Sequence, residues 1–253
     1  RTDDKKIVLR KWCAEHGFES CLLHSDSDWY LHAQKYNRPG DIPLKFPTEV
    51  ERGCPYDCGV CPDHEQHMCL GLIDLTDDCN LACPTCFADS KGSAYLTMDQ
   101  IKAALDGFIE QEGVGAVIQF SGGEPTMHPQ IVEAVKEAID RPTEVVMINT
   151  NGIKFAQDED LIKRLVDVSE NKLEIYLQFD GFTDEVHQKI RGAKLADIKM
   201  KAIENMLKHG LPINLAAVIQ RGVNEDQVGK IVEFGIETKG IRGVNFQPAF
   251  FAG

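Results

Sequence analysis

The sequence lacks the features that mark membrane, secreted and nucleic-acid-binding proteins. It has no apolar run near the ~18 residues that a membrane-spanning helix needs, and its first residues lack the basic-then-apolar pattern of a secretory signal. Positive charge is also scarce, because 27 Lys and Arg residues stand against 40 Asp and Glu residues, giving a formal net charge of -13. A field of that sign repels a phosphate backbone. We therefore expect a cytoplasmic protein, and we expect no nucleic-acid partner.

Cysteine is absent after residue 86, yet the chain holds nine cysteines. Seven of them lie between Cys54 and Cys86. The odd count and the short, regular spacings argue against a disulfide framework. Thiols crowded in this way in a cytosolic protein typically hold metal.

After residue 70, short apolar runs alternate with helical patterns. The expected strands span 71–76, 116–120, 144–149, 173–179, 213–219 and 243–248, and the expected helices span 97–112, 128–140, 158–170, 184–209 and 225–239. We expect the fourth helix to be broken near Gly192. Repeated strand–helix units predict an α/β fold, and six units predict a partial (β/α)6 barrel with its chemistry at the carboxyl ends of the strands.

The chain is expected to divide into three segments. Residues 1–50 contain both tryptophans and no strand–helix unit, which predicts a small N-terminal cysteine-containing module. Residues 51–70 form a cysteine-rich segment. Residues 71–253 form the barrel, which we expect to continue beyond the last residue because the chain stops just after the sixth strand.

The first expected barrel strand is followed by Cys79, Cys83 and Cys86, with the spacing C-x3-C-x2-C. Three thiolates on a short loop can hold three irons of a [4Fe–4S] cluster and leave the fourth iron without a protein ligand. The alternative is a structural zinc site, but a closed zinc site needs four ligands, and the fourth would have to be Cys69.

The second expected strand ends in Ser121-Gly122-Gly123-Glu124-Pro125. Two glycines let a backbone approach a ligand closely, and a neighbouring carboxylate can pair with an ammonium group. Alone, Gly-Gly at a strand end is often only a turn. Polar residues also end the third and fourth strands, and these are Asn149, Gln178 and Asp180.

Together these motifs resemble the radical S-adenosylmethionine (SAM) superfamily, over residues 71–253. The resemblance implies that Cys79, Cys83 and Cys86 ligate a [4Fe–4S] cluster whose open iron binds SAM. The implied SAM contacts are Ser121, Gly122, Gly123 and Glu124 at the methionine amine, Gln178 or Asp180 at the ribose, Thr85 and Phe87 beside the adenine, and Asn149 at the neighbouring strand end. Thr85 departs from the family, which usually has an aromatic residue before the third cysteine.

The resemblance also implies the type of reaction. In this family the reduced cluster gives one electron to SAM, and the resulting 5'-deoxyadenosyl radical abstracts hydrogen from the substrate. The expected partner is a low-potential electron donor such as ferredoxin or flavodoxin. A non-catalytic iron–sulfur protein is the alternative of a different class, but it would leave the Gly-Gly-Glu motif without a ligand.

A second set of cysteines, Cys54, Cys58, Cys61 and Cys69, precedes the barrel. Four thiolates can close a cluster completely, so we predict an auxiliary [4Fe–4S] cluster here. A structural zinc site is the alternative, because four cysteines also suit tetrahedral zinc. His64 and His67 lie within this loop and are alternative ligands to Cys69.

The segment from Gly53 to Ala88 resembles a narrower group, the archaeal tetraether-lipid synthase type of radical SAM enzyme. This resemblance implies carbon–carbon bond formation between lipid hydrocarbon chains, with a lipid or membrane surface as partner and a location at the membrane periphery. Arg191, Lys194 and Arg221 are the nearest cations for a lipid headgroup. The alternative within the group is radical methylation of a pterin-like small molecule. A long apolar tunnel would favour the lipid, and a compact polar pocket the pterin.

Cys13 begins a Cys-x-Glu-His-Gly segment near the N-terminus. In the same group this segment resembles part of a rubredoxin-like metal knuckle, which makes Cys13 a candidate ligand of a third site. The alternative is that Cys13 and Cys21 are ordinary buried thiols.

Overall fold

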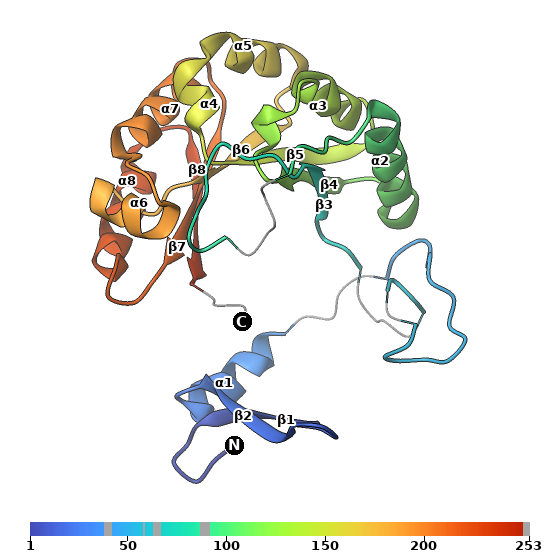
Figure 1. The fold of residues 1–253 in the computed structure, drawn as a ribbon. Helices are drawn as coiled ribbons and strands as arrows, with labels where there is room; N and C mark the ends of the chain where they lie inside the picture. Colours follow the sequence, from blue (N-terminus) through green and yellow to red (C-terminus); the bar gives the residue numbers. More distant parts are fainter. Residues whose placement is uncertain (38–41, 58, 63–66, 87–91, 250–253) are drawn as a thin grey trace.

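The computed structural model describes residues 1–37, 42–57, 59–62, 67–86 and 92–249. Its main body is a six-stranded parallel sheet whose strands follow one another in chain order (Figure 1). The strands are β3 (Gly71–Thr76), β4 (Ala116–Gly122), β5 (Thr143–Thr150), β6 (Leu173–Gln178), β7 (Ile213–Ile219) and β8 (Ile241–Pro248). All six predicted strands are confirmed, and the parallel pairing places their carboxyl ends at one edge of the sheet.

Helices cover the outer face of this sheet (Figure 1). They are α2 (Met98–Glu112), α3 (Ile131–Ile139), α4 (Ile153–Gln157), α5 (Glu159–Val168), α6 (Asp184–Arg191), α7 (Ala196–Lys208) and α8 (Val228–Glu237). The break predicted near Gly192 separates α6 from α7, and Gly192 has the left-handed φ of 76° that ends α6. The predicted helix 128–140 begins only at Ile131, after a 3-10 turn at Pro125–Met127, and α4 was not predicted.

The two faces of the sheet differ in polarity. Ile73 and Leu75 of β3 are buried in the hydrophobic core together with Ile101 and Leu105 of α2. Successive side chains of a strand point to opposite faces, so the residues between these buried positions point toward the inside of the barrel. The inner face of β3 therefore carries Leu72 and Asp74, and the same face of the neighbouring strands carries both apolar and polar residues, among them Met147, Ser121 and Asn149.

The N-terminal residues form a hairpin and a helix outside the barrel sheet. Strands β1 (Ile7–Cys13) and β2 (Gly17–His24) pair antiparallel, and α1 (Ser27–Ala33) is followed by a 3-10 turn at Gln34–Tyr36. Large apolar side chains are exposed here, with Phe18 at 80% and Trp12 at 65% of full exposure. A two-stranded hairpin without a buried face is marginally stable by itself. The division of the chain at residues 50 and 70 stays a prediction.

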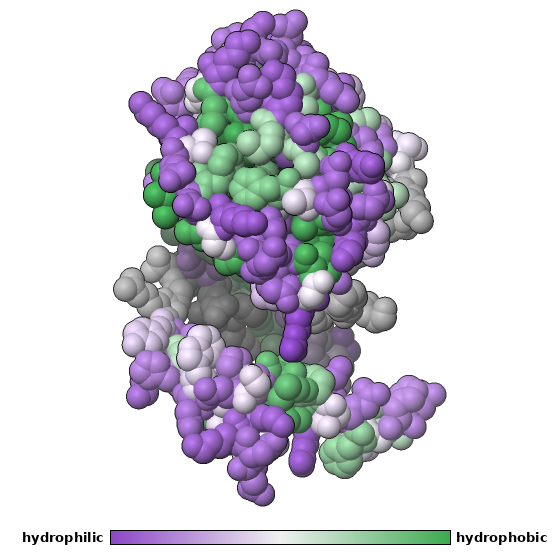
Figure 2. Space-filling model, turned by 90° about the vertical axis from the view of Figure 1, so that its left-hand side faces the viewer, coloured by the Kyte–Doolittle hydropathy of each residue, from purple (hydrophilic) through white to green (hydrophobic). Residues whose placement is uncertain are grey.

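Figure 2 shows both hydrophilic and hydrophobic areas on this side of the surface, with the hydrophobic areas lying between hydrophilic ones. Within the described residues, no helix is both long enough and apolar enough to cross a membrane.

Candidate functional site

The three cysteines of the C-x3-C-x2-C motif lie on the loop that leaves β3. Cys79 and Cys83 are half-buried and Cys86 is exposed. Burial raises the pKa of the Cys79 and Cys83 thiols, and repulsion from Glu124 (for Cys79) and from other cysteines of the loop (for both) raises it further. The three sulfurs are therefore close enough to interact, and a bound cation or cluster would relieve the cost of ionising them.

The donor set fits a cluster better than a single zinc ion. Among the described residues, no three His, Cys, Asp or Glu side chains converge as a single-ion site requires. In a [4Fe–4S] cube each thiolate binds a different iron, so its cysteines lie farther apart than the ligands of one ion. Three cysteines on one loop are the donor set that a [4Fe–4S] cluster with an open iron needs, and their ligation of that cluster stays a prediction.

The glycines of the Ser-Gly-Gly-Glu motif hold the end of β4 against the start of the cysteine loop. Gly123 N donates to Thr76 O (2.7 Å), and Glu124 N donates to Asp78 O (2.8 Å). A Cβ on Gly122 would lie 2.3 Å from Thr76 O, and a Cβ on Gly123 would lie 2.2 Å from Asp78 O. Both positions therefore require glycine. The two backbone hydrogen bonds fix the motif against the start of the cysteine loop.

Glu124 is buried, and its carboxylate is held by the protein. Oε1 accepts hydrogen bonds from Thr126 Oγ1 (2.6 Å), Thr150 Oγ1 (2.7 Å) and Thr126 N (3.2 Å), while Oε2 accepts one from Asn151 N (2.7 Å). This carboxylate thus fixes the end of β5 against the end of β4. Its contact with the SAM amine stays a prediction, and Oε2 is the oxygen with the smaller number of partners.

Asn151 connects this carboxylate to the cysteine loop. Its side chain donates from Nδ2 to Asn80 Oδ1 (2.6 Å), and Asn80 lies between Cys79 and Cys83. Its carbonyl accepts a hydrogen bond from Nζ of Lys199 in α7, a lysine with no exposed surface. Burial lowers the pKa of Lys199 to about 8. Neither Asn151 nor Lys199 was among the predicted site residues.

Helix α6 packs its C-terminal end on the same loop. Arg191 donates from Nε and Nη2 to the two carboxylate oxygens of Asp180 (2.7 and 2.9 Å). It also hydrogen-bonds Cys83, which lowers the pKa of that thiol against the effect of burial. Thr85 Oγ1 donates to Ile190 O (3.0 Å), which gives Thr85 an anchoring contact of its own.

Asp180 is completely buried and also accepts a hydrogen bond from Val218 N (2.9 Å). Its carboxylate is therefore engaged inside the protein, and the ribose contacts of Asp180 and Gln178 stay predictions. The sequence makes Arg191 a candidate cation for a lipid headgroup. The structure corrects this, because the guanidinium is buried and paired with Asp180.

A row of polar side chains crosses the inner face of the barrel just below the strand ends. We call Asp74, Ser121, Asn149 and Tyr176 the polar belt. Asp74 is in register with Ser121, and Asn149 is in register with Tyr176. Asn149 Nδ2 donates to Ser121 Oγ (3.3 Å), and the Tyr176 hydroxyl accepts from Gln247 Nε2 (3.2 Å). The belt thus lies on four consecutive strands.

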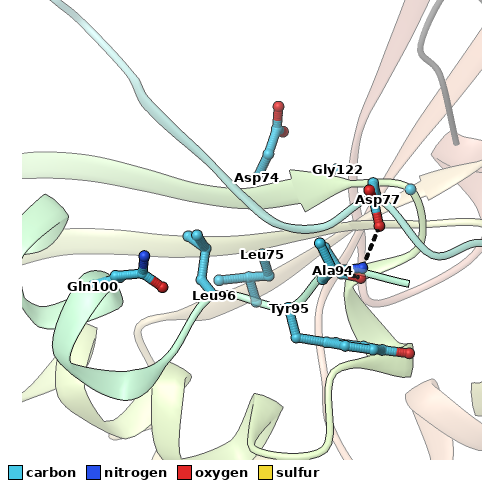
Figure 3. A pocket seen from close by; sticks show the side chains of 10 residues that line it. Asp74, Leu75, Asp77, Ala94, Tyr95, Leu96, Gln100 and Gly122 are labelled. Carbon is cyan, nitrogen blue, oxygen red and sulfur yellow. Dashed lines mark hydrogen bonds between the residues drawn. The ribbon is translucent and has the colours of Figure 1, made fainter. Parts of the chain in front are cut away.

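A cavity of about 470 Å³ opens at one end of the belt. Asp74, Asp77, Tyr95, Gly122 and Gly123 are among the residues that line it. Figure 3 shows the side chain of Asp74 pointing away from Leu75 and Leu96, on the opposite side of the strand. The cavity therefore adjoins both the cysteine loop and the glycine motif.

The other predicted metal sites are not assembled by the described residues. Cys54 and Cys69 are exposed and Cys61 is buried, and within the described part of the chain they form no three-ligand group. Cys58, His64 and Phe87 lie outside the described residues. The Nδ1 atom of His67 lies 3.1 Å from Glu112 Oε2. The auxiliary cluster, its zinc alternative and the SAM contact of Phe87 stay predictions.

Cys13 ends β1 at the tip of the hairpin and is exposed, as is Cys21. Its sulfur lies 3.6 Å from His16 Nδ1. Backbone N–H groups of Glu15 and His16 lower the pKa of its thiol. The alternative of two buried thiols is wrong, because both side chains are exposed, and the metal-knuckle hypothesis stays a prediction.

The chain is similar in sequence to known proteins. It is 38% identical over 256 residues to the 7,8-dihydro-6-hydroxymethylpterin dimethyltransferase of Methanocaldococcus jannaschii, covering 99% of this chain and 50% of that protein. It is 27% identical over 172 residues to the probable GTP 3',8-cyclase of Pyrococcus horikoshii, covering 67% of this chain and 53% of that protein. The chain thus spans about half the length of these relatives.

Solved structures share the fold. The structure of anSMEcpe with bound AdoMet superposes with a TM-score of 0.58 at 22% identity, covering 72% of this chain and 51% of that one. Streptococcus suis SuiB bound to S-adenosylmethionine gives a TM-score of 0.59 at 18% identity, covering 72% and 39%. The family model described as the Radical SAM superfamily matches residues 73–235, which include both motifs, most of β3 and all of β4 to β7. The protein therefore belongs to the radical SAM superfamily.

Proposed function

We propose that this protein uses SAM to methylate a pterin-like heterocycle. The observation that carries the proposal is the polarity of the barrel's inner face, where the polar belt lies directly below the strand ends that carry the cluster and SAM motifs. The relative with 38% identity is named as a pterin dimethyltransferase. Pterins and guanine nucleotides share a 2-amino-4-oxopyrimidine ring, so the relative named as a probable GTP cyclase takes a substrate that carries the same ring.

The lipid substrate of the narrower resemblance has less support. A hydrocarbon chain against the polar belt would bury Asp74, Asn149 and Tyr176 without hydrogen-bond partners from the ligand, and each such group carries a desolvation cost. A flat heterocycle with several donors and acceptors can satisfy them. The polar inner face therefore favours the pterin alternative.

The cluster would be held by Cys79, Cys83 and Cys86, and when bound it supplies the electron that cleaves SAM. The protein's own residues place the reacting molecules. Gly122 and Gly123 bring the backbone of β4 close to the cysteine loop. Arg191 holds Cys83 in place by a hydrogen bond. The electron donor stays a prediction, and a ferredoxin or flavodoxin fits the low potential that this chemistry needs.

The proposal is tested with the anaerobically reconstituted protein, dithionite, SAM and 7,8-dihydro-6-hydroxymethylpterin. We expect methionine, 5'-deoxyadenosine and a product heavier by one or two methyl groups, measured by mass spectrometry. SAM labelled in its methyl group shows whether that methyl enters the product. Turnover only with lipid vesicles would overturn the pterin substrate, and SAM that stays intact would favour the non-catalytic alternative.

A further inference from the structure

Two carboxylates lie on the inner face of the described strands, and they differ in their partners. Glu174 of β6 accepts a hydrogen bond from Asn214 Nδ2 (2.6 Å) and pairs with Arg242. Asp74 of β3 is exposed and has no hydrogen bond or ion pair with the rest of the described chain. Within the described part of the chain, this carboxylate, which helps to line the cavity of about 470 Å³, is thus left with both oxygens available.

The charge around Asp74 limits what can bind there. Asp77 lines the same cavity, and Asp78 follows Asp77 in the sequence, so this end of the belt is rich in negative charge. An anionic group such as a phosphate would be repelled at this end of the belt. A neutral ligand edge that presents N–H donors would be attracted, because it satisfies the carboxylate without bringing negative charge.

We propose that Asp74 binds the amino edge of the substrate's 2-amino-4-oxopyrimidine ring, an inference that rests on the proposed function. The ring N3–H and one hydrogen of the 2-amino group are parallel donors in one plane. They match the two oxygens of a carboxylate in the same way as the paired N–H groups of arginine do. Asp74 would then select rings that carry the amino group over rings that carry oxygen in its place.

Asp74→Asn tests the inference by binding instead of turnover. The probes are oxidised 6-hydroxymethylpterin, which is not turned over, and the matching lumazine, in which oxygen replaces the 2-amino group. Both are measured by equilibrium dialysis against reconstituted protein with SAM and without reductant. A charge-assisted hydrogen-bonded pair contributes about 10- to 100-fold in affinity. We therefore expect the native protein to bind the pterin more tightly than the lumazine by about that factor. Asp74→Asn should bind the two ligands equally.

Asp167→Asn is the matched control, because it removes the same charge from the exposed surface of α5. It should keep the native preference. Iron content and SAM affinity should be unchanged in both variants, since Asp74 has no partner in the described chain whose position it supports. If Asp74→Asn loses iron or SAM binding, the residue supports the cysteine loop and the recognition role is overturned.

The outcomes separate the inference from the function on which it rests. If the native protein binds neither heterocycle, the pterin function fails. If it binds the pterin but Asp74→Asn keeps the preference, the function stands and the role of Asp74 falls. If it instead prefers guanosine triphosphate to inosine triphosphate, which lacks the amino group, and Asp74→Asn abolishes that preference, Asp74 keeps its role and the substrate becomes a guanine nucleotide.

Discussion

Glu124, which the sequence predicts to contact SAM, also holds the fold together. Its four hydrogen bonds come from residues up to 27 positions away, so the carboxylate joins the ends of β4 and β5. A carboxylate that satisfies four buried donors is costly to change, because those donors lose a strong acceptor.

Glu124→Gln is therefore expected to lower both SAM affinity and stability. The amide places a donor where the carboxylate accepted, so we expect the free energy of unfolding to fall by about 1–3 kcal/mol, measured by urea denaturation. SAM affinity should fall by about one to two orders of magnitude, measured by calorimetry, with cluster content intact. Glu133→Gln, exposed on α3, is the control. Unchanged stability would contradict the hydrogen-bond network seen at Glu124.

Lys199 gives stability a dependence on pH. Burial lowers its folded pKa to about 8 from 10.5. Between these two pH values the unfolded chain binds more protons than the folded one, so the free energy of unfolding rises with pH. Below about pH 8 the lysine is charged in both states, and the full cost of burying its ammonium group is present. The shift corresponds to about 3 kcal/mol.

Lys199→Met should remove this rise in the cluster-free protein. We expect its free energy of unfolding to rise less between pH 8 and 10.5 than that of Lys201→Met. Lys201 is an exposed lysine of the same helix and is paired with Glu204. Equal slopes in the two variants would show that Lys199 does not carry the effect.

At the scale of elements, α6 and the cysteine loop behave as one unit. Arg191 reaches Cys83 and Asp180, Thr85 binds the Ile190 carbonyl, and a Cβ on Gly192 would lie 3.3 Å from Ala82 O. Because the loop is held from this side, the position of the helix should influence how well the loop accepts a cluster.

Arg191→Gln tests this coupling. Removing one partner of a buried ion pair leaves Asp180 uncompensated and is expected to cost about 3–5 kcal/mol of stability. Iron content after reconstitution should also fall, whereas Lys194→Gln, a change at an exposed cation nearby, should leave both unchanged. Full iron loading in Arg191→Gln would mean that α6 does not support the loop.

The strands and most helices were predictable because their hydrophobic periods are strong, while α4, with five residues, is too short to show one. The site was predictable only in part. Its cysteines and glycines follow from local spacing, but the partners of Glu124 and Asp180 are set by contacts between distant segments. Lys199 resembles the surface lysines beside it in a charged helix, and only packing shows that it is buried.

At the scale of the whole molecule, the open question is the number of clusters. The triple variant Cys79→Ala, Cys83→Ala, Cys86→Ala should lose one cluster's iron and all SAM cleavage. Residual iron would support a cluster at Cys54, Cys58, Cys61 and Cys69, whereas zinc without iron would identify the upstream site as structural. SAM cleavage at the native rate would contradict the assignment of the three loop cysteines.

The polar inner face has a calorimetric consequence. An empty barrel lined by Asp74, Asn149 and Tyr176 is hydrated, and an incoming heterocycle exchanges hydrogen bonds with water for hydrogen bonds with protein. Because part of the surface that leaves water is polar, binding should show a smaller negative heat-capacity change than a hydrocarbon chain of similar size would show. Calorimetric titration of 6-hydroxymethylpterin at several temperatures measures this change as the slope of the binding enthalpy against temperature. The size of that slope shows how much apolar surface leaves water when the ligand enters the barrel.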